Sequence, residues 1–377
     1  MTKLLRRRLL LATLLLVALL AGGCDKVPDL PELELAADNP VRMLVVNEGL
    51  FTTNTSALSA IYDDGTVYWD VFEPINQRPL GDVAQSITEI NGYYFMAINN
   101  SRRVEVIDAN TFGAVASLRY TQSGSPRYIT PLTDSTALVS DLYGQLVRIS
   151  TVAPFEILEY IPLPTPSKGI EQMVTVSGKV LGVYLDHGVA IFDADKIRIS
   201  EMRLLEKIKI PWEMGGCRPL VDHRGRVWFT NRMDRGVRLS AVDPVSEAVV
   251  DVVEIPFDAN GAIVGMPNYN KVDIDPTGHR IYINLYHTDD TGDRLQVVYT
   301  VDTDNHRLRK YMELPGVKMM YGMSVSPEGD VCICDCLDYS AQRGYVRVFG
   351  KEGGAAKSYK VGVYPNFVYF PRAEEGR

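Results

Sequence analysis

The residues best suited to chemistry in this chain of 377 residues are polar and aromatic side chains that recur at matching places along it. They supply amides, guanidinium groups and phenol rings, which suit a large ligand with many hydrogen-bonding groups and flat faces. For each of them the alternative is structural, because buried loop ends need polar side chains to satisfy their own backbone. One set follows the second strand of each repeat unit predicted below: Asn47, Asn99, Asn100, Asp141, Tyr143, Tyr184, His187, Asn231, Arg232, Tyr286, His287, Asp338 and Tyr339. The other set lies in or beside the links between units: Arg78, Asp82, Gln85, Arg127, Tyr128, Gln172, Arg218, Asn268, Tyr269 and Tyr321.

Catalytic motifs are not visible in the sequence, which has no nucleophile elbow, phosphate-binding loop or zinc-binding His-Glu pair. Glu171, Asn268 and Asp82 could imitate the metal site of a lactonase-like hydrolase, but the set is incomplete. We therefore expect no enzymatic activity, no metal and no cofactor.

The cysteines and histidines also give no strong indication of a metal site. Cys332, Cys334 and Cys336 alternate along one predicted strand, so all three face one side, where disulfide geometry is poor and small buried core residues are the expectation. A soft-metal site is the alternative, although the spacing matches no standard zinc pattern. Three histidines fall in short turns (His223, His279 and His306), and we expect them to be surface residues.

The N-terminus has the features of a bacterial lipoprotein signal. A basic start is followed by the apolar run Leu9–Ala21, which is too short for a comfortable membrane span. Leu20–Cys24 resembles a lipobox, which predicts a signal peptide at 1–23 and a lipidated Cys24; a secreted protein cut near Ala21 is the alternative. Residues 24–40 are acidic and contain proline, as expected of a flexible tether. The net charge of −8 argues against nucleic acid as a partner.

The segment Gln85–Ser125 shows the unit from which the rest of the chain is built. It holds four short apolar or alternating runs, predicted as strands at Ser86–Ile90, Tyr93–Ile98, Val104–Asp108 and Ala114–Leu118. Asn91-Gly92 between the first two is a strong tight-turn signal. No helical period occurs, so the unit is predicted to be one antiparallel four-stranded blade.

Similar units follow to the end of the chain, and their number and spacing predict an all-β, seven-bladed propeller over 41–372, with a tail at 373–377. The first unit, with strands at Val41–Asn47, Leu58–Tyr62 and Thr66–Phe72, lacks its first strand, while Asn366–Phe370 is left over at the end. The leftover strand can complete the first blade and close the ring, which removes exposed sheet edges. Two stacked sandwiches are the alternative architecture.

The propeller prediction also places the candidate residues. Loops after second strands and the links between blades share one face, here called the recognition face, whereas the turns after first and third strands share the opposite turn face. Turn-face loops are short and generic, such as Arg224-Gly225 and Thr277-Gly278. Recognition-face loops are longer, polar and aromatic, and His187 and His287 lie among them. The candidate ligand-binding residues should therefore converge on one mouth.

Several segments resemble the YncE-like propeller lipoproteins of Bacteroidetes, and the resemblance covers essentially all of the chain after the tether. The segments that carry it are Arg78–Ser86, Asn99–Ser101, Val104–Asp108, Gly124–Ile129, Asp335 with Asp338-Tyr339, Gly344–Val346 and Gly362–Phe370. The acidic run after Cys24 also resembles the surface-export signal of lipoproteins from the same group.

The BtuG-type members of that family imply a function. They lie on the outer surface, cap a TonB-dependent BtuB-type transporter and capture cobalamin on one propeller face. The resemblance therefore implies a lipid-anchored, cell-surface protein of the outer membrane that captures a corrinoid and delivers it to such a transporter. Capture of haem, a siderophore or a glycan by the same fold, an adhesion or protein-scaffold role, and a lactonase-like hydrolase are the alternatives.

Overall fold

The computed structural model describes residues 39–206, 208, 218–258, 263–266, 271–288, 292–351 and 356–371. These residues belong to one compact unit, Leu33–Arg377. The predicted signal peptide, the tether up to residue 38 with Cys24, the tail 373–377, and the candidates Asn268 and Tyr269 lie outside the described residues.

Within the described ranges, no helix has the length and apolar character needed to cross a membrane.

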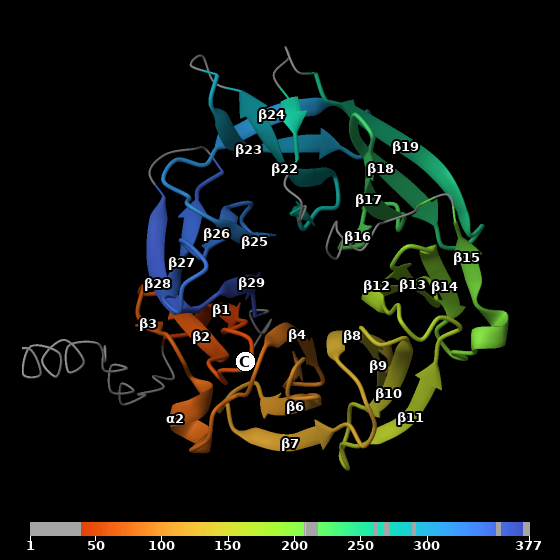
Figure 1. Cartoon of the computed structure of the whole chain (residues 1–377), viewed down its shortest axis with the longest axis vertical. Helices are drawn as coiled ribbons and strands as arrows, with labels where there is room; N and C mark the ends of the chain where they lie inside the picture. Colours follow the sequence, from red (N-terminus) through yellow and green to blue (C-terminus); the bar gives the residue numbers. More distant parts are fainter. Residues whose placement is uncertain are drawn as a thin grey trace, which may run out of the picture. The chain divides into compact units, whose positions relative to one another are not determined.

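The described residues form seven antiparallel sheets arranged as the blades of a propeller, which confirms the all-β prediction (Figure 1). Each sheet runs from an inner strand at the central channel to an outer strand at the rim. Blade one consists of β29 (Pro365–Tyr369), β1 (Val41–Asn47), β2 (Ala57–Tyr62) and β3 (Val67–Tyr68). Blade two consists of β4 (Ala84–Ile90), β5 (Tyr93–Ile98), β6 (Arg103–Asp108) and β7 (Ala114–Arg119). Blade three consists of β8 (Pro126–Thr133), β9 (Thr136–Asp141), β10 (Gln145–Ser150) and β11 (Ile157–Pro162).

The remaining blades follow the same order from inside to outside. Blade four consists of β12 (Ile170–Val176), β13 (Lys179–Tyr184), β14 (Gly188–Asp193) and β15 (Arg203–Leu205), with the short helix η1 (Ile199–Glu201) before its last strand. Blade five consists of β16 (Leu220–Val221), β17 (Val227–Met233), β18 (Gly236–Asp243) and β19 (Ala248–Pro256). Blade six consists of β20 (Ile263–Gly265), β21 (Val272–Ile274), β22 (Arg280–Thr288), β23 (Arg294–Asp302) and β24 (Leu308–Glu313). Blade seven consists of β25 (Met320–Val325), β26 (Val331–Asp335), β27 (Arg343–Phe349) and β28 (Lys357–Val363).

The ring is closed by the last strand of the chain, as the sequence predicts. β29 pairs antiparallel with β1, with Leu44 opposite Tyr369 and Val45 opposite Val368. The inner strand of blade one thus comes from the C-terminal end of the propeller and its other strands from the N-terminal end. A propeller closed in this way leaves neither terminal strand unpaired on its own.

The tight turns form where glycine and asparagine predict them. Asn91 and Gly92 have φ angles of 54° and 78°, and they connect the paired residues Ile90 and Tyr93. Positive φ at both positions is the requirement of the type I′ hairpin turn, which Asn-Gly meets at low cost.

Two segments differ from the sequence prediction. The strand expected at Thr66–Phe72 is limited to Val67–Tyr68, and helix α2 (Phe72–Asn76) follows it. The buried Asp70 carboxylate favours the helix, because it accepts a hydrogen bond from the Phe72 backbone N–H at 2.8 Å. Blade six also gains β20, which pairs with β22 beside β21 and was not predicted.

Hydrophobic side chains pack mainly between neighbouring blades. One cluster joins blades one and two through residues such as Leu44 and Met96, and another joins blades seven and one through Cys334 and Val368. The largest cluster joins blades four, five and six around the fully buried Trp228. The core is therefore a ring of interfaces between blades.

Polar side chains connect the inner strands near the channel. The Ser86 and Thr88 hydroxyls of β4 donate to the backbone carbonyls of Arg127 and Ile129, at 2.7 and 2.9 Å. On its other side, β4 receives a bond from the Asn366 side chain to the Gln85 carbonyl at 3.2 Å. Side chains therefore satisfy backbone groups that no neighbouring strand reaches.

Truncation of a buried side chain in the closing strand should weaken the fold. Val368 is 1% exposed, so we expect Val368→Ala to lower the free energy of unfolding by about 2 kcal/mol, through lost burial and a residual cavity. The control Val245→Ala, at a side chain 77% exposed, should change it by less than about 0.5 kcal/mol. Urea unfolding followed by fluorescence measures both, and equal effects would contradict a closure made by β29.

The buried Asp70 predicts a pH-dependent stability. Burial raises the pKa of its carboxyl group from 3.8 to about 7. A raised pKa favours folding while the group is protonated, so this contribution is complete below pH 3.8 and is lost as the pH rises through about 7. Asp70→Asn should therefore gain stability relative to the native chain between pH 4 and 7 and hold that gain above. Melting temperatures across this range test it, and parallel curves for the two proteins would contradict it.

Candidate functional site

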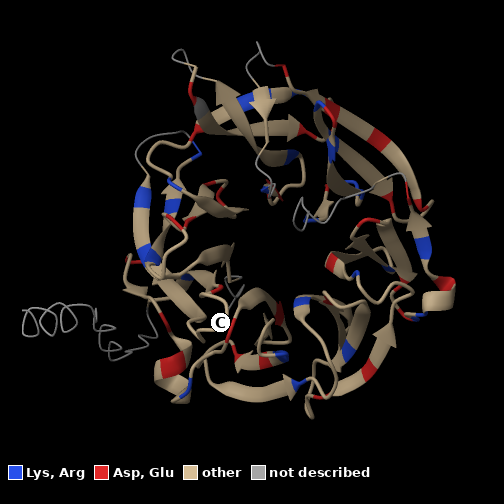
Figure 2. Ribbon diagram, viewed as in Figure 1, with Lys and Arg blue, Asp and Glu red and all other residues tan. Residues whose placement is uncertain are grey.

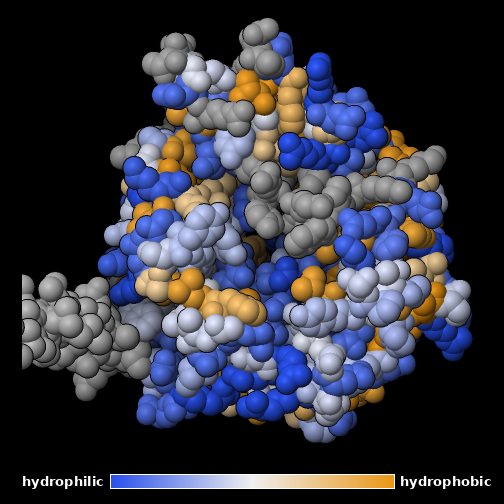
Figure 3. All heavy atoms as spheres, viewed as in Figure 1, coloured by the Kyte–Doolittle hydropathy of each residue, from blue (hydrophilic) through white to orange (hydrophobic). Residues whose placement is uncertain are grey.

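A pocket of about 660 Å³ lies in the central channel, and side chains from all seven blades line it. Most of these side chains come from the first residues of the inner strands, just after the recognition-face links. The mouth is visible as a hollow at the centre of the ring, bordered by both hydrophilic and hydrophobic side chains (Figure 3). The volume falls in the range of small-molecule sites.

Seven of the predicted ligand-binding residues meet at this pocket. They come from five different blades, each of which contributes its inner strand, a link or a recognition-face loop. These residues are Gln85, Arg127, Tyr128, Gln172, Arg218, Tyr321 and Tyr339.

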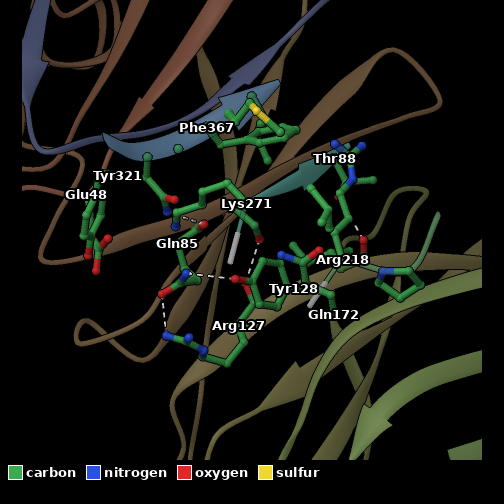
Figure 4. Close-up of a pocket in the computed structure, with 18 of the residues that line it drawn as sticks. Glu48, Gln85, Thr88, Arg127, Tyr128, Gln172, Arg218, Lys271, Tyr321 and Phe367 are labelled. Atoms are coloured by element: carbon green, nitrogen blue, oxygen red, sulfur yellow. Dashed lines mark hydrogen bonds between the residues drawn. The ribbon is translucent and has the colours of Figure 1, made fainter. Parts of the chain in front are cut away.

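Arg127 is held in a hydrogen-bonded row with its neighbours (Figure 4). Its Nε lies 3.1 Å from both carboxylate oxygens of the buried Glu171, and its Nη1 donates to the Gln85 side-chain oxygen. The Gln85 Nε2 in turn donates to the Tyr128 hydroxyl at 3.2 Å. Burial alone would lower the pKa of Arg127, but the Glu171 carboxylate raises it overall, so this guanidinium stays charged.

Arg218 is fixed by a second carboxylate. Its Nη1 lies 2.9 Å from Oδ1 of Asp273, and the other oxygen of Asp273 accepts the Val325 backbone N–H at 2.8 Å. The guanidinium also stacks over the Phe367 ring, 5.3 Å from its centroid. Asp273 therefore positions an arginine at the pocket and joins blades six and seven.

Glu48, Tyr321 and Lys271 form the third polar group at the pocket. The Lys271 Nζ lies 5.4 Å from the centroid of the Tyr321 ring. Burial lowers the pKa of Lys271, partly offset by Glu48. Burial also raises the pKa of Glu48, although the Tyr321 hydroxyl, Arg127 and Lys271 oppose this shift.

The charges around the pocket nearly balance. The cations are Arg127, Arg218 and Lys271, and the acids beside them are Glu48, Glu171 and Asp273. Acidic and basic residues are likewise interspersed around the whole ring (Figure 2). The site presents many hydrogen-bonding groups without a strong net charge.

Several lining residues were not among the predicted candidates. Glu48 directly follows the predicted Asn47, and Lys271 directly precedes β21 of blade six, so position in the repeat was a usable signal for both. The apolar lining residues Met173, Met320 and Phe367 carried no such signal, because inner strands are apolar in any propeller.

Five other predicted residues around blades one to three make contacts within the fold. The buried Asn47 amide donates to the carbonyls of Val45 and Ala57 and to the Ser59 hydroxyl. Arg78 forms a bidentate pair with the buried Glu105. Asp82 Oδ2 accepts hydrogen bonds from the Asn100 side chain and the Thr52 backbone, and Asn99 reaches the Pro126 carbonyl at 3.4 Å.

Four more candidates lie in the recognition-face loops of blades three and four. The Asp141 carboxylate is fully buried and accepts backbone N–H bonds from Ser125 and Tyr143, at 2.7 Å each, while the Tyr143 side chain is exposed. The hydroxyl of buried Tyr184 accepts the Thr165 N–H at 3.2 Å, and its ring contacts His187 at 4.4 Å between centroids.

The last five candidates lie in blades five to seven, outside the pocket. Asn231 is buried at 7% exposure, and Arg232 follows it on the same strand. Tyr286 pairs with Gly265 of β20, and His287 Nδ1 lies 3.0 Å from the Tyr299 hydroxyl. Asp338 is exposed and accepts the Ser340 backbone N–H.

The three alternating cysteines are buried free thiols in the core. Cys332 and Cys334 pack in the cluster between blades seven and one, and Cys336 is 1% exposed. Burial raises the pKa of all three, which keeps them as thiols. This agrees with the expectation of small core residues.

Comparison with known proteins places the chain in a family. Residues 42–372 match the family described as a domain of unknown function, DUF5074, and the chain belongs to it. No match to a curated protein was found.

Several solved structures share the fold. A quinonprotein alcohol dehydrogenase-like protein from Bacteroides thetaiotaomicron is similar with a TM-score of 0.66 and 16% identity, over 89% of this chain and 79% of that one. A Bacteroides uniformis protein provisionally described as a 6-phosphogluconolactonase is similar with a TM-score of 0.62 and 12% identity, over 89% of this chain and 100% of that one. A protein from Bacteroides fragilis with the same provisional description is similar with a TM-score of 0.60 and 11% identity, over 90% of this chain and 100% of that one. At such identities the likeness shows the fold alone, a propeller that is also found in Bacteroides proteins.

Loss of the carboxylate beside Arg127 should destabilise the protein. Glu171→Ala leaves the guanidinium at the pocket without its ion-pair partner, so we expect the free energy of unfolding to fall by about 3 kcal/mol. Glu254→Ala is the matched control, because it breaks the solvent-exposed pair with Arg238 and should cost less than about 1 kcal/mol. Chemical denaturation measures both, and equal losses would contradict a structural role for the Arg127–Glu171 pair.

Proposed function

We propose that this protein captures a small-molecule ligand at the central mouth of its recognition face and does not transform it. The observation that carries this proposal is the pocket of about 660 Å³ to which all seven blades contribute side chains. A pure scaffold needs no such pocket, whereas binding sites combine an enclosed volume with a few placed polar groups.

The ligand that best matches this chemistry is a corrinoid such as cobalamin. A corrinoid is large and flat and carries many amide groups, which amides, phenols and paired guanidiniums can recognise by hydrogen bonds. Both arginines at the pocket already have carboxylate partners, and the local charges nearly balance. That balance favours a ligand rich in neutral amides over the more anionic haem or ferric siderophores. Only part of such a large ligand would enter the pocket, with the ring lying across the mouth.

The proposal also includes delivery of the captured ligand to a transporter. The lipobox-like segment ending at Cys24 and the acidic tether would place the propeller on the outer membrane, facing the outside of the cell. From there it would pass the corrinoid to a TonB-dependent transporter of the BtuB type. Its support is the resemblance to BtuG-type proteins.

A lactonase-like hydrolase is the weaker candidate. The observation in its favour is that the chain shares its fold with proteins provisionally described as 6-phosphogluconolactonases. However, the carboxylates that could bind a catalytic metal have other partners: Glu171 is paired with Arg127, and Asp82 accepts bonds from Thr52 and Asn100. These contacts favour binding without catalysis.

Calorimetric titration of the detergent-solubilised full chain with cyanocobalamin and dicyanocobinamide tests the proposal. We expect one-to-one binding that weakens at least about tenfold in Gln172→Ala, which removes an amide from the pocket lining, and in Glu48→Gln, which removes a carboxylate from it. Glu328→Gln is the matched control for the charge change, since Glu328 is exposed in a turn-face loop, and it should bind like the native chain.

If neither corrinoid produces heat at high micromolar concentration, the proposal that the ligand is a corrinoid is rejected. Haem, ferric siderophores and glycans would then be titrated against the same variants. Binding that Glu328→Gln weakens as much as Glu48→Gln would contradict the location of the site.

A further inference from the structure

Two histidines and an aspartate meet on the turn face, away from the pocket and its proposed ligand. His223 lies in the turn between β16 and β17 of blade five, and His279 in the turn between β21 and β22 of blade six. Asp304 lies in the next turn of blade six, between β23 and β24. One potential ligand atom from each lies within 4.8 Å of the other two.

The backbone holds the two histidines together. The His223 N–H donates to the Gly278 carbonyl at 3.3 Å, so the turns of blades five and six are in direct contact. Gly278 has a φ of 72°, and a Cβ atom at this position would lie 2.4 Å from the His223 nitrogen. This close approach brings the imidazole rings to a centroid distance of 3.8 Å, with an angle of 29° between their planes.

The hydrogen bonds orient the possible ligand atoms. The His223 Nδ1 lies 3.4 Å from the Gly278 carbonyl, and its Nε2 lies 3.3 Å from Asp304 Oδ1. With its proton on Nδ1, His223 donates to that carbonyl and directs the lone pair of Nε2 toward the carboxylate. Such a bond from the second ring nitrogen to a carbonyl is the usual support of a metal-binding histidine. The His279 Nδ1 lies 3.3 Å from the other oxygen, Asp304 Oδ2.

We propose that His223, His279 and Asp304 bind a divalent transition metal of the zinc type and thereby join blades five and six. Two imidazoles and one carboxylate suit Zn²⁺, which takes three protein ligands and leaves a position for water. Mg²⁺ prefers oxygen ligands only and should not bind. The cation would lie between the histidine nitrogens and the Asp304 carboxylate, in place of their direct contacts.

One neighbouring side chain competes with the metal. The Arg224 guanidinium pairs with Asp304 Oδ1, and its side chain is 54% exposed, so it can turn away into solvent. Removal of its charge should leave the carboxylate more available. Arg224→Gln is therefore expected to bind Zn²⁺ a few-fold more tightly, a gain that a purely structural cluster would not show.

Calorimetric titration with zinc chloride tests the site, on the full chain in detergent and without a polyhistidine tag. We expect one Zn²⁺ per chain, a higher melting temperature in its presence, and no heat from magnesium chloride. His223→Ala and His279→Ala should each weaken binding by more than about tenfold, because even outer-shell partners of a metal are worth about 10–100-fold.

The matched control is a third histidine of the turn face. His306 pairs with Asp251 and has a φ of 60°, so His306→Asn removes an imidazole with little backbone strain and should bind Zn²⁺ like the native chain. Melting temperatures without metal show whether each variant is folded. Zinc binding that survives in folded His279→Ala, or an affinity unchanged in Arg224→Gln, would overturn the assignment, as would the absence of binding.

Discussion

The structure depends on how the unpaired backbone groups of its seven inner strands find hydrogen-bond partners around one channel. An inner strand pairs with a single neighbour in its own blade, so half of its backbone groups face the next blade or the pocket. Side chains meet this need: Ser86 and Thr88 bond to the carbonyls of β8, and the Ser324 hydroxyl accepts the Val368 N–H of β29. Polar residues near the axis are therefore required by the fold, with or without a ligand.

This constraint also explains the character of the pocket. The links end where the inner strands begin, so the side chains that enter the channel at this level come from positions already fixed by bonds between blades. Gln85 shows both roles, because its backbone carbonyl accepts a bond from Asn366 while its side chain connects Arg127 and Tyr128. Groups held in this way lose little conformational entropy when they bind a ligand.

The sequence predicted the repeat well, because strand patterning and turn residues are local signals. Tyr93–Ile98 was predicted as it is found, and the leftover strand at the end predicted the closure by β29. Helix α2 was not predicted, since the burial of Asp70 that favours it depends on tertiary packing. Similarly, β20 has only three residues and is a strand because it pairs with β22, a contact that local sequence does not indicate.

The site was predicted less completely than the fold. The sequence placed polar residues on the recognition face, and seven of them line the pocket. It could not separate Gln85, which faces the pocket, from Asn47, whose amide is used within blade one. That distinction depends on the direction of a side chain at a strand end, which the tertiary structure sets. Glu48 and Lys271 lie at aligned positions of the repeat but were not selected as candidates.

The position of β1 between β29 and β2 has a mechanical consequence. Any force that reaches the propeller through the segment before Asn39 enters the described fold at Val41, the first residue of β1. Both ladders are antiparallel, and Leu44, for example, is opposite Tyr369 on one side and Ala60 on the other. Because the hydrogen bonds lie across the strand, a pull along β1 loads both ladders in shear, and many bonds must break together. The strand that closes the ring thus also reinforces the point at which a tethered propeller would be pulled by flow or by a moving partner.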